Sequence, residues 1–186
     1  RKMGNKKAKF VERDNYFRNE MKIQVLGCAK VGKTCMLLNY ATGSFPKDDY
    51  IPVALENIEN IVEWEKEKRV EIEIRDSVCG KQYERIRHSA FATANIFIIC
   101  FSLIEEAEVS TQQIKEWIDE INEKAENTLF VLVGCKADLT KERLLSSQEG
   151  VNLAEEIGAS GYVECSAVTG QNVKEAIERT TAILMR

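Results

Sequence analysis

The stretch GCAKVGKTC, residues 27–35, decides the fold of this chain. It is a complete G-x4-GK[ST] pattern, preceded by the apolar run KIQVLG (22–27) and followed by an amphipathic stretch (33–42). A strand, a glycine-rich loop and then a helix is the arrangement in which such loops bind phosphate groups. The sequence therefore predicts a phosphate-binding loop between a first strand and a first helix.

The residue types within this loop explain the prediction. Glycines at Gly27 and Gly32 let the backbone curl so that its N–H groups point inward, and the helix start adds its positive end. Lys33 can then reach the β- and γ-phosphates, and the Thr34 hydroxyl can ligate Mg²⁺. The residues that we expect around the phosphates are Gly27, Ala29, Lys30, Val31, Gly32, Lys33, Thr34 and Cys35.

Beyond the loop, strand-like and helix-like segments alternate. The apolar runs at residues 22–27, 70–74, 95–101, 128–134 and 161–166 are of strand length, and amphipathic helical stretches lie near 33–42, 81–92, 109–125, 147–157 and 171–185. This alternation predicts a mostly parallel sheet with helices on both faces, with ligands bound at the carboxyl edge of the strands. The segment 57–75 differs, because two strand-like runs flank the charged tip EKEK. It predicts a β-hairpin that adds one antiparallel edge strand.

Composition is that of one globular domain, with 186 residues, 44% hydrophobic and 30% charged. Residues 1–20 carry seven Lys/Arg against three acidic side chains, and we expect a basic, disordered leader before a domain spanning 21–186. The net charge of −4 argues against general nucleic-acid binding. Six scattered cysteines favour reduced thiols, and the single histidine, His88, leaves little material for His-based zinc sites or catalysis.

Five motifs in order resemble the Ras superfamily of small GTPases, most closely its Rho family, over residues 21–186. They are GKTC followed by MLL (32–38), SFPKDDYIPVALEN (44–57), the Asp76 region with YERIR (83–87), LVGCKADL (132–139) and ECSA (164–167). The resemblance implies a P-loop NTPase G domain, an α/β fold with a mostly parallel six-stranded sheet. A Rho protein would carry an additional helical insert between the last two motifs, and this chain has a short interval there.

The resemblance also assigns the base and the metal. Asp138 would accept both N–H donors of the guanine edge, Lys136 and Phe45 would cover its two faces, and the Ala167 backbone N–H after Ser166 would donate to the guanine carbonyl. Mg²⁺ would be bound through Thr34 and Asp76, with GTP or GDP as the ligand. Cys135 stands where the family most often has Asn, and a thiol cannot replace an amide, so weaker guanine binding is expected.

Other departures from the family pattern gather where the γ-phosphate would lie. Val53 follows Pro52 where the family has a Mg²⁺-binding Thr, and Ala29 stands at a phosphate-loop glycine. In DSVCG (76–80), Cys79 replaces a glycine and Gly80 replaces the catalytic glutamine, so no residue is left to orient the attacking water. Lys30 either adds charge near the phosphates or faces solvent. GTP hydrolysis is therefore expected to be slow or absent.

Three functional hypotheses remain open. The first is a guanine-nucleotide-binding signalling domain with impaired hydrolysis, and the second is a pseudo-GTPase that keeps the fold as a protein-interaction module and binds nucleotide weakly or not at all. An unrelated P-loop ATPase or kinase would leave Asp138 and the ECSA turn unexplained. By the resemblance, protein effectors or regulators would bind through residues 44–57 and 76–92. We expect a cytoplasmic monomer without a prenylation motif at Arg186, whose membrane contact, if any, is peripheral and made by the leader.

Overall fold

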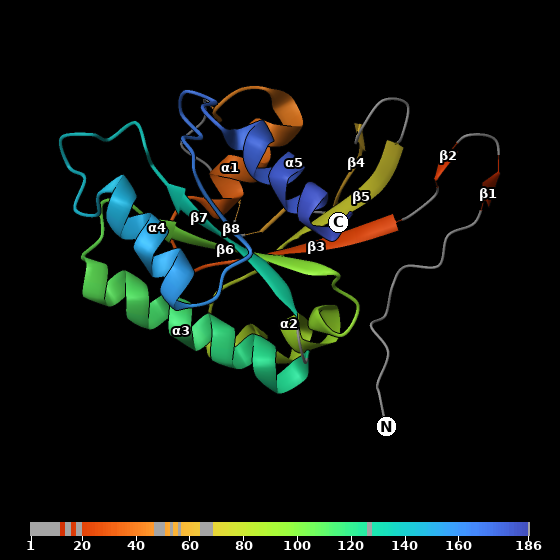
Figure 1. The fold of residues 1–186 in the computed structure, drawn as a ribbon, viewed down its shortest axis with the longest axis horizontal. Coiled ribbons are helices and arrows are strands. Elements are labelled where there is room, and N and C mark those ends of the chain that lie inside the picture. Colours follow the sequence, from red (N-terminus) through yellow and green to blue (C-terminus); the bar gives the residue numbers. More distant parts are fainter. Residues whose placement is uncertain are drawn as a thin grey trace.

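The computed structural model describes residues 20–46, 51–52, 54–55, 57–63, 69–125 and 128–185, together with the backbone at 12–13 and 16–17. The predicted disorder of residues 1–20 falls mostly outside this part of the chain. Within it, β1 (Glu12–Arg13) and β2 (Tyr16–Phe17) form a short antiparallel pair beside the main body (Figure 1). Among the described residues, no helix is both long and apolar enough to span a bilayer.

A six-stranded sheet forms the centre of the domain. Its strands, in spatial order, are β4 (Ile58–Glu63), β5 (Arg69–Asp76), β3 (Glu20–Leu26), β6 (Ile96–Ser102), β7 (Leu129–Cys135) and β8 (Gly161–Glu164). All neighbouring pairs are parallel except β4 and β5, which pair antiparallel from Ile58↔Ile74 to Glu63↔Arg69. The predicted hairpin and its antiparallel edge strand are thus confirmed.

Helices cover both faces of this sheet. They are α1 (Lys33–Thr42), α2 (Glu84–Phe91), preceded by the 3-10 turn η1 (Lys81–Tyr83), α3 (Ala107–Lys124), α4 (Ser147–Glu156) and α5 (Val173–Leu184). One face carries α1 and α5, and the other carries α2, α3 and α4 (Figure 1). The predicted helix at 81–92 is therefore a 3-10 turn followed by an α-helix. Between β7 and β8 the described chain has α4 alone, in agreement with the short interval in the sequence.

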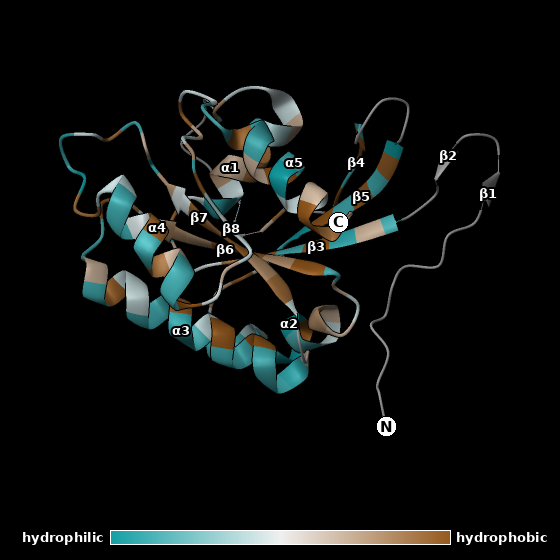
Figure 2. Ribbon diagram, viewed as in Figure 1, coloured by the Kyte–Doolittle hydropathy of each residue, from teal (hydrophilic) through white to brown (hydrophobic). Residues whose placement is uncertain are grey.

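Two apolar cores form because the central strands are covered on both sides. Every residue of β6 is buried, which is why that strand reads as a continuous hydrophobic run. Figure 2 shows β6 and β7 mostly in hydrophobic or intermediate colours, whereas β3 and β5 carry hydrophilic bands and α3 and α4 alternate between hydrophilic and hydrophobic colours. Helix α4 begins with a capping box, since the Ser146 hydroxyl accepts from the Glu149 N–H and Glu149 bonds back to the Ser146 N–H.

The connections after β3, β5, β6, β7 and β8 all leave from the carboxyl ends of parallel strands. In such sheets, ligands bind at this edge, where neighbouring connections run to opposite faces. The chain leaves β3 for α1 on one face, whereas it leaves β6 for α3 on the other. The sequence motifs that were assigned to nucleotide binding therefore converge at one edge of the sheet.

Candidate nucleotide-binding site

The phosphate loop has the backbone that its two glycines permit. Gly27 has φ +145°, and a Cβ there would lie 2.5 Å from the Cys100 carbonyl oxygen, so a larger residue would collide with β6. Gly32 has φ +118°, and a Cβ there would approach the Cys135 Cβ to 3.1 Å. Gly32 caps α1 without a side-chain hydrogen bond, which leaves the first N–H groups of the helix available to a ligand.

Lys33 and Thr34 begin α1 on the inner side of the loop. Both are buried, at 6% and 8% exposure, so the Lys33 ammonium brings positive charge into a recessed position. The Cys35 thiol lies in the same first turn and is half-buried. Burial raises its pKa, and the charges of Lys136 and Lys33 act in the opposite direction, so both cations lie near it. The structure thereby brings the loop and the GCKADL segment together.

Thr34 also meets Asp76 at the end of β5. The Thr34 hydroxyl donates to Asp76 Oδ2 at 2.8 Å, and the Leu55 N–H donates to the same oxygen at 3.3 Å. Burial raises the pKa of Asp76, while the Thr34 bond and the Lys33 charge oppose that change. Asp76 Oδ1 is buried and has no hydrogen-bond partner among the described residues.

These two side chains fit the Mg²⁺ that the resemblance implies. A hydroxyl and a carboxylate with an unsatisfied oxygen are the ligands that this ion prefers, and it commonly takes the remainder from phosphates and water. No group of three or more His, Cys, Asp and Glu side chains in the described part of the chain could hold a metal ion by itself. A metal at Thr34 and Asp76 would therefore depend on a phosphate ligand.

The candidate base pocket is built by the loops after β7 and β8. The Ser166 hydroxyl donates to Asp138 Oδ1 at 2.6 Å, and the Ala137 N–H donates to the Cys165 carbonyl at 3.1 Å. Lys136 adopts a left-handed backbone with φ +67°. The Ser166 bond fixes one carboxylate oxygen of Asp138 and so orients the group that would accept the guanine N–H donors.

Asn39 of α1 completes this pocket and was not found from the sequence. Its side-chain amide donates to the Ala167 carbonyl at 2.9 Å, and the residue is 7% exposed. This bond ties the helix after the phosphate loop to the turn that would present the Ala167 N–H. Phe45 lies after the end of α1 and is half-buried.

Cys135 differs from the amide that it replaces because it is a buried thiol. It is 2% exposed, and its interaction with Cys100, together with burial, raises its pKa well above the ordinary value. A thiol is a weak hydrogen-bond partner and cannot brace the phosphate loop as an amide would. A Cβ at Gly32 would lie 3.1 Å from the Cys135 Cβ and 3.7 Å from its Sγ, so Cys135 packs close to the loop.

The DSVCG segment is fixed by one side chain from α2. Arg87 Nη1 donates to the carbonyls of Val78 at 3.0 Å and Gly80 at 2.8 Å. Arg87 Nε and Nη2 donate to Glu120 of α3, each at 3.0 Å, and its guanidinium carbon lies 5.0 Å from the centre of the Trp117 ring. The arginine lay within the quoted YERIR motif, but its spacing gave no sign of this role. We call this arrangement the Arg87 clamp.

Gly80 itself has φ +118° and ψ 145°, a backbone that residues with side chains rarely adopt. A Cβ at this position would lie 2.8 Å from Gln82 Oε1, so the Gln82 amide already lies beside it. Ala29 and Lys30 lie on the exposed side of the phosphate loop, and Lys30 has φ +66°. Val53 lies outside the described residues.

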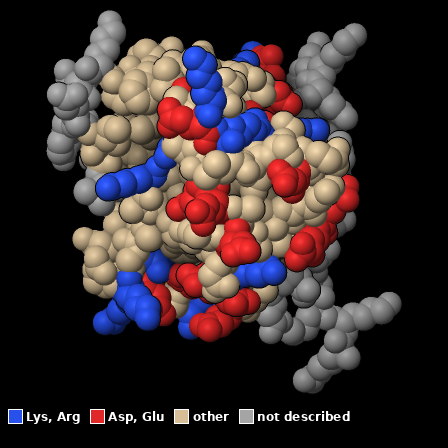
Figure 3. Space-filling view, turned by 90° about the vertical axis from the view of Figure 1, so that its left-hand side faces the viewer, with Lys and Arg blue, Asp and Glu red and all other residues tan. Residues whose placement is uncertain are grey.

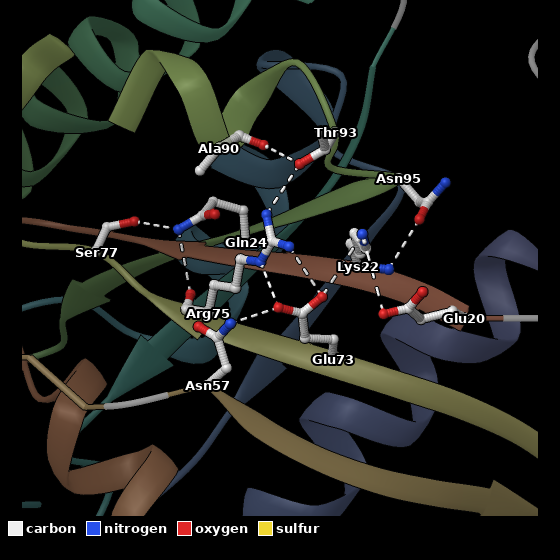
Figure 4. Close-up of polar contacts among 10 residues, drawn as sticks. All are labelled: Glu20, Lys22, Gln24, Asn57, Glu73, Arg75, Ser77, Ala90, Thr93 and Asn95. Atoms are coloured by element: carbon white, nitrogen blue, oxygen red, sulfur yellow. Dashed lines mark hydrogen bonds and ion pairs between the residues drawn. The ribbon is translucent and has the colours of Figure 1, made fainter. Parts of the chain in front are cut away.

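A polar network holds the end of the 44–57 segment, which was assigned to partners. The Glu73 carboxylate accepts from Arg75 at 2.7 and 2.9 Å and from the Asn57 amide at 2.5 Å, and Arg75 also reaches Thr93 at 2.9 Å (Figure 4). The Arg75 bond lowers the pKa of Glu73 despite its burial. Asn57 ends the 44–57 segment, so this network anchors it to β5.

Surface charge is mixed on the side of the molecule that lies at the left of Figure 1. Figure 3 shows Lys and Arg intermixed with Asp and Glu there, without one sign dominating among the described residues. Positive charge for phosphates would therefore come from the buried Lys33 rather than from a basic surface.

Comparisons with known proteins agree with this geometry. The model of the Ras family matches residues 22–186. The chain is 36% identical to GTP-binding protein RHO1 of Saccharomyces cerevisiae over 173 residues, covering 86% of this chain and 81% of that protein. It is 32% identical to GTP-binding protein RHO1 of Candida albicans over 177 residues, covering 89% and 88%.

Proposed function

The chain belongs to the Ras family of small GTPases, and on that premise we propose that it is a guanine-nucleotide-binding signalling domain in which GTP hydrolysis is slow or absent. As a small GTPase most similar to Rho proteins, it is a nucleotide-binding protein. The finer proposal concerns its chemistry. The residues that hold a diphosphate are present, whereas those that would act on the terminal phosphate are altered.

Binding would rest on this chain's own groups. The free N–H groups at the start of α1 and the buried Lys33 ammonium would hold the phosphates. Mg²⁺, held through Thr34 and Asp76, would neutralise charge on the phosphate oxygens. Asp138, oriented by Ser166, would select guanine because its carboxylate accepts two parallel N–H donors.

The proposal of slow hydrolysis rests on the side chain and backbone of residue 80. Gly80 has no side chain to orient a water molecule, and its carbonyl is held by Arg87. Its φ of +118° also disfavours any residue with a Cβ. A single Gly80→Gln change would therefore be strained, and the preceding Cys79 lacks the torsional freedom that a glycine would provide.

A paired substitution tests this proposal. Cys79→Gly with Gly80→Gln restores both a flexible hinge and an amide, and single-turnover GTP hydrolysis should rise at least roughly tenfold. The matched control is Cys79→Gly with Gly80→Ala, which restores the hinge without the amide and should leave the rate near that of the parent chain. A parent rate equal to that of the repaired variant would contradict the proposal.

The pseudo-GTPase remains a second candidate, favoured by the buried thiol at Cys135. Identification of the nucleotide released on denaturation, with Mg²⁺-dependent binding of fluorescent GDP and GTP analogues, separates the two candidates. Binding that is lost in Lys33→Ala and Asp138→Ala supports the signalling domain. Absence of any bound guanine nucleotide at micromolar concentrations would favour the interaction module.

Partners and location are extensions of the same proposal. Protein effectors or regulators would bind through residues 44–57 and 76–92, whose inner sides are anchored by Glu73 and Arg87 respectively. We propose a cytoplasmic location, with peripheral membrane contact limited to the basic residues 1–20. Crosslinking of the protein to vesicles that contain anionic lipid, compared between chains with and without residues 1–20, would test the proposed membrane contact.

A further inference from the structure

The Gln82 side chain occupies the space beside Gly80 that a side chain at residue 80 would need. A Cβ placed on Gly80 would lie 2.8 Å from Gln82 Oε1, 3.0 Å from Gln82 Nε2 and 3.1 Å from the amide carbon of Gln82. A glutamine at residue 80 would carry its own amide close to this point, because only one methylene group separates the amide carbon from the Cβ. The chain therefore has an amide beside residue 80, although that residue has no side chain.

This amide is available to a ligand. Gln82 is exposed, and its side chain forms no hydrogen bond with another residue that the structure describes. Gln112 of α3 is also exposed, but its amide donates to Glu116 at 3.0 Å. A glutamine amide carries an acceptor oxygen and an NH2 group with two donors. Both functions of the Gln82 amide can therefore bind a molecule beside Gly80.

The backbone that carries this amide is braced. Asp76 Oδ2 accepts from the Thr34 hydroxyl at 2.8 Å, which joins the start of the DSVCG segment to the phosphate loop. At the other end of the segment, the Arg87 clamp holds the Gly80 carbonyl at 2.8 Å. Gln82 follows in the 3-10 turn η1, which Gly80 caps. A short, braced segment therefore connects the Gln82 amide to the candidate Mg²⁺ ligands.

We propose that Gln82 orients the attacking water in GTP hydrolysis by this chain, in place of the side chain that Gly80 lacks. The inference rests on the proposed function, because it requires that GTP is bound and is hydrolysed slowly. It narrows that proposal from slow or absent hydrolysis to slow hydrolysis that one side chain supports.

The role requires an amide that binds two partners at once. The Gln82 oxygen would accept a hydrogen bond from the attacking water, and the NH2 group would donate to a γ-phosphate oxygen. The water oxygen bonds to the γ-phosphorus while the bond from that phosphorus to the β–γ bridging oxygen breaks. GDP leaves with the electron pair of that bond, and both water protons end on inorganic phosphate as dihydrogen phosphate. The amide itself is unchanged, since it orients the water and exchanges no proton.

The same geometry explains why hydrolysis would be slow. Gln82 reaches this space from an exposed turn, whereas a side chain at residue 80 would start from the clamped backbone itself. Misalignment of a positioning group lowers the rate of reaction steeply. In Gly80→Gln, the new Cβ would lie 2.8 Å from Gln82 Oε1, so the two amides cannot share this space. They are therefore alternatives, and their effects on the rate should not add.

Removal of the Gln82 amide tests the role. In Gln82→Ala, the single-turnover rate of GTP hydrolysis should fall roughly fivefold or more, while the Kd values for fluorescent GDP and GTP analogues stay within about twofold of the parent values. Gln82→Glu should lose as much, because a carboxylate cannot donate to phosphate. The matched control is Gln112→Ala, which removes an exposed glutamine from α3 and should leave the rate unchanged. An unchanged rate in Gln82→Ala, or a parent rate no faster than that of GTP in buffer, would overturn the inference.

A double-mutant cycle separates orientation of the water from support of the fold. In the variant Cys79→Gly with Gly80→Gln, the restored amide should take over, so the addition of Gln82→Ala should no longer lower the rate. The same fractional loss in this variant and in the parent chain would mean that Gln82 only supports the segment, and would overturn the inference. A loss of nucleotide affinity that matches the loss of rate would overturn it as well, since Gln82 would then act in binding.

These outcomes are distinct from failure of the proposed function. A parent chain that binds no guanine nucleotide would refute both the signalling domain and the role of Gln82. Bound nucleotide with a hydrolysis rate that does not depend on Gln82 would refute the inference alone.

Discussion

Removing the Arg87 side chain should release the DSVCG segment and cost about 3 kcal/mol of folding free energy. Arg87 is 6% exposed, and its four polar contacts join two backbone carbonyls to Glu120. Breaking a buried ion pair by removing one partner costs roughly 3–5 kcal/mol because the other charge is left unpaired. We expect the lower end for Arg87→Ala, since Glu120 is 20% exposed and His88 Nε2 lies 3.2 Å from it.

Two measurements separate the global from the local part of this effect. Urea denaturation gives the change in unfolding free energy, and hydrogen exchange of the amides at residues 77–83 reports the freedom of the segment itself. The matched control is Glu120→Gln, whose amide oxygen can still accept from Arg87 and which should lose about 1 kcal/mol. Arg87→Lys should lose less than Arg87→Ala but more than Glu120→Gln, because an ammonium keeps a charge opposite Glu120 and cannot reproduce the planar fork. A loss below about 1 kcal/mol for Arg87→Ala, with unchanged exchange at 77–83, would refute the clamp.

Three further changes have defined outcomes. Gly27→Ala should lower the unfolding free energy by roughly 3 kcal/mol or more in a thermal melt, because its Cβ would collide with a carbonyl of β6. The control Gly43→Ala, where φ is +71° and the space around a Cβ is open, should cost about 1 kcal/mol. Asn39→Ala should weaken fluorescent GDP binding by roughly fivefold in a titration, since it removes the bond to Ala167. The pKa of Glu73 is lower in the folded state than in the unfolded chain, so the ionised carboxylate stabilises the fold above the unfolded pKa, and this stabilisation is lost as pH falls. In Glu73→Gln, the free energy of unfolding measured by urea denaturation should therefore fall less steeply below about pH 5 than in the parent chain.

The fold was predictable because its signals are local and strong. Continuous apolar runs such as β6 arise only where a strand is covered on both faces, and the G-x4-GK[ST] loop requires a strand before it and a helix after it. The charged tip between residues 57 and 75 excluded a helix and so predicted the antiparallel β4 and β5. Helix ends were less exact, since η1 and α2 together occupy what read as one helix.

The site was predictable where a backbone conformation or a motif defines it, and not where side chains meet across the sheet. Gly27 and Gly32 do adopt the left-handed backbones that the loop requires. Asn39 and Arg87 escaped notice because a buried amide or guanidinium on a helix resembles any surface polar residue until its partners are known. Their bonds join residues far apart in the sequence, and periodicity carries no information about such pairs.

Cys79 affects the mobility of the DSVCG segment as well as its chemistry. A glycine at this position would provide torsional freedom beside the γ-phosphate, and a cysteine removes it. The Arg87 clamp then holds the carbonyls on both sides of this residue, so the segment is restrained. Loss of mobility at Cys79 would by itself oppose the rearrangement that a γ-phosphate drives. If so, Cys79→Gly alone should increase both nucleotide release and hydrogen exchange at residues 77–83. Equal exchange in Cys79→Gly and the parent chain would show that the clamp alone restrains the segment.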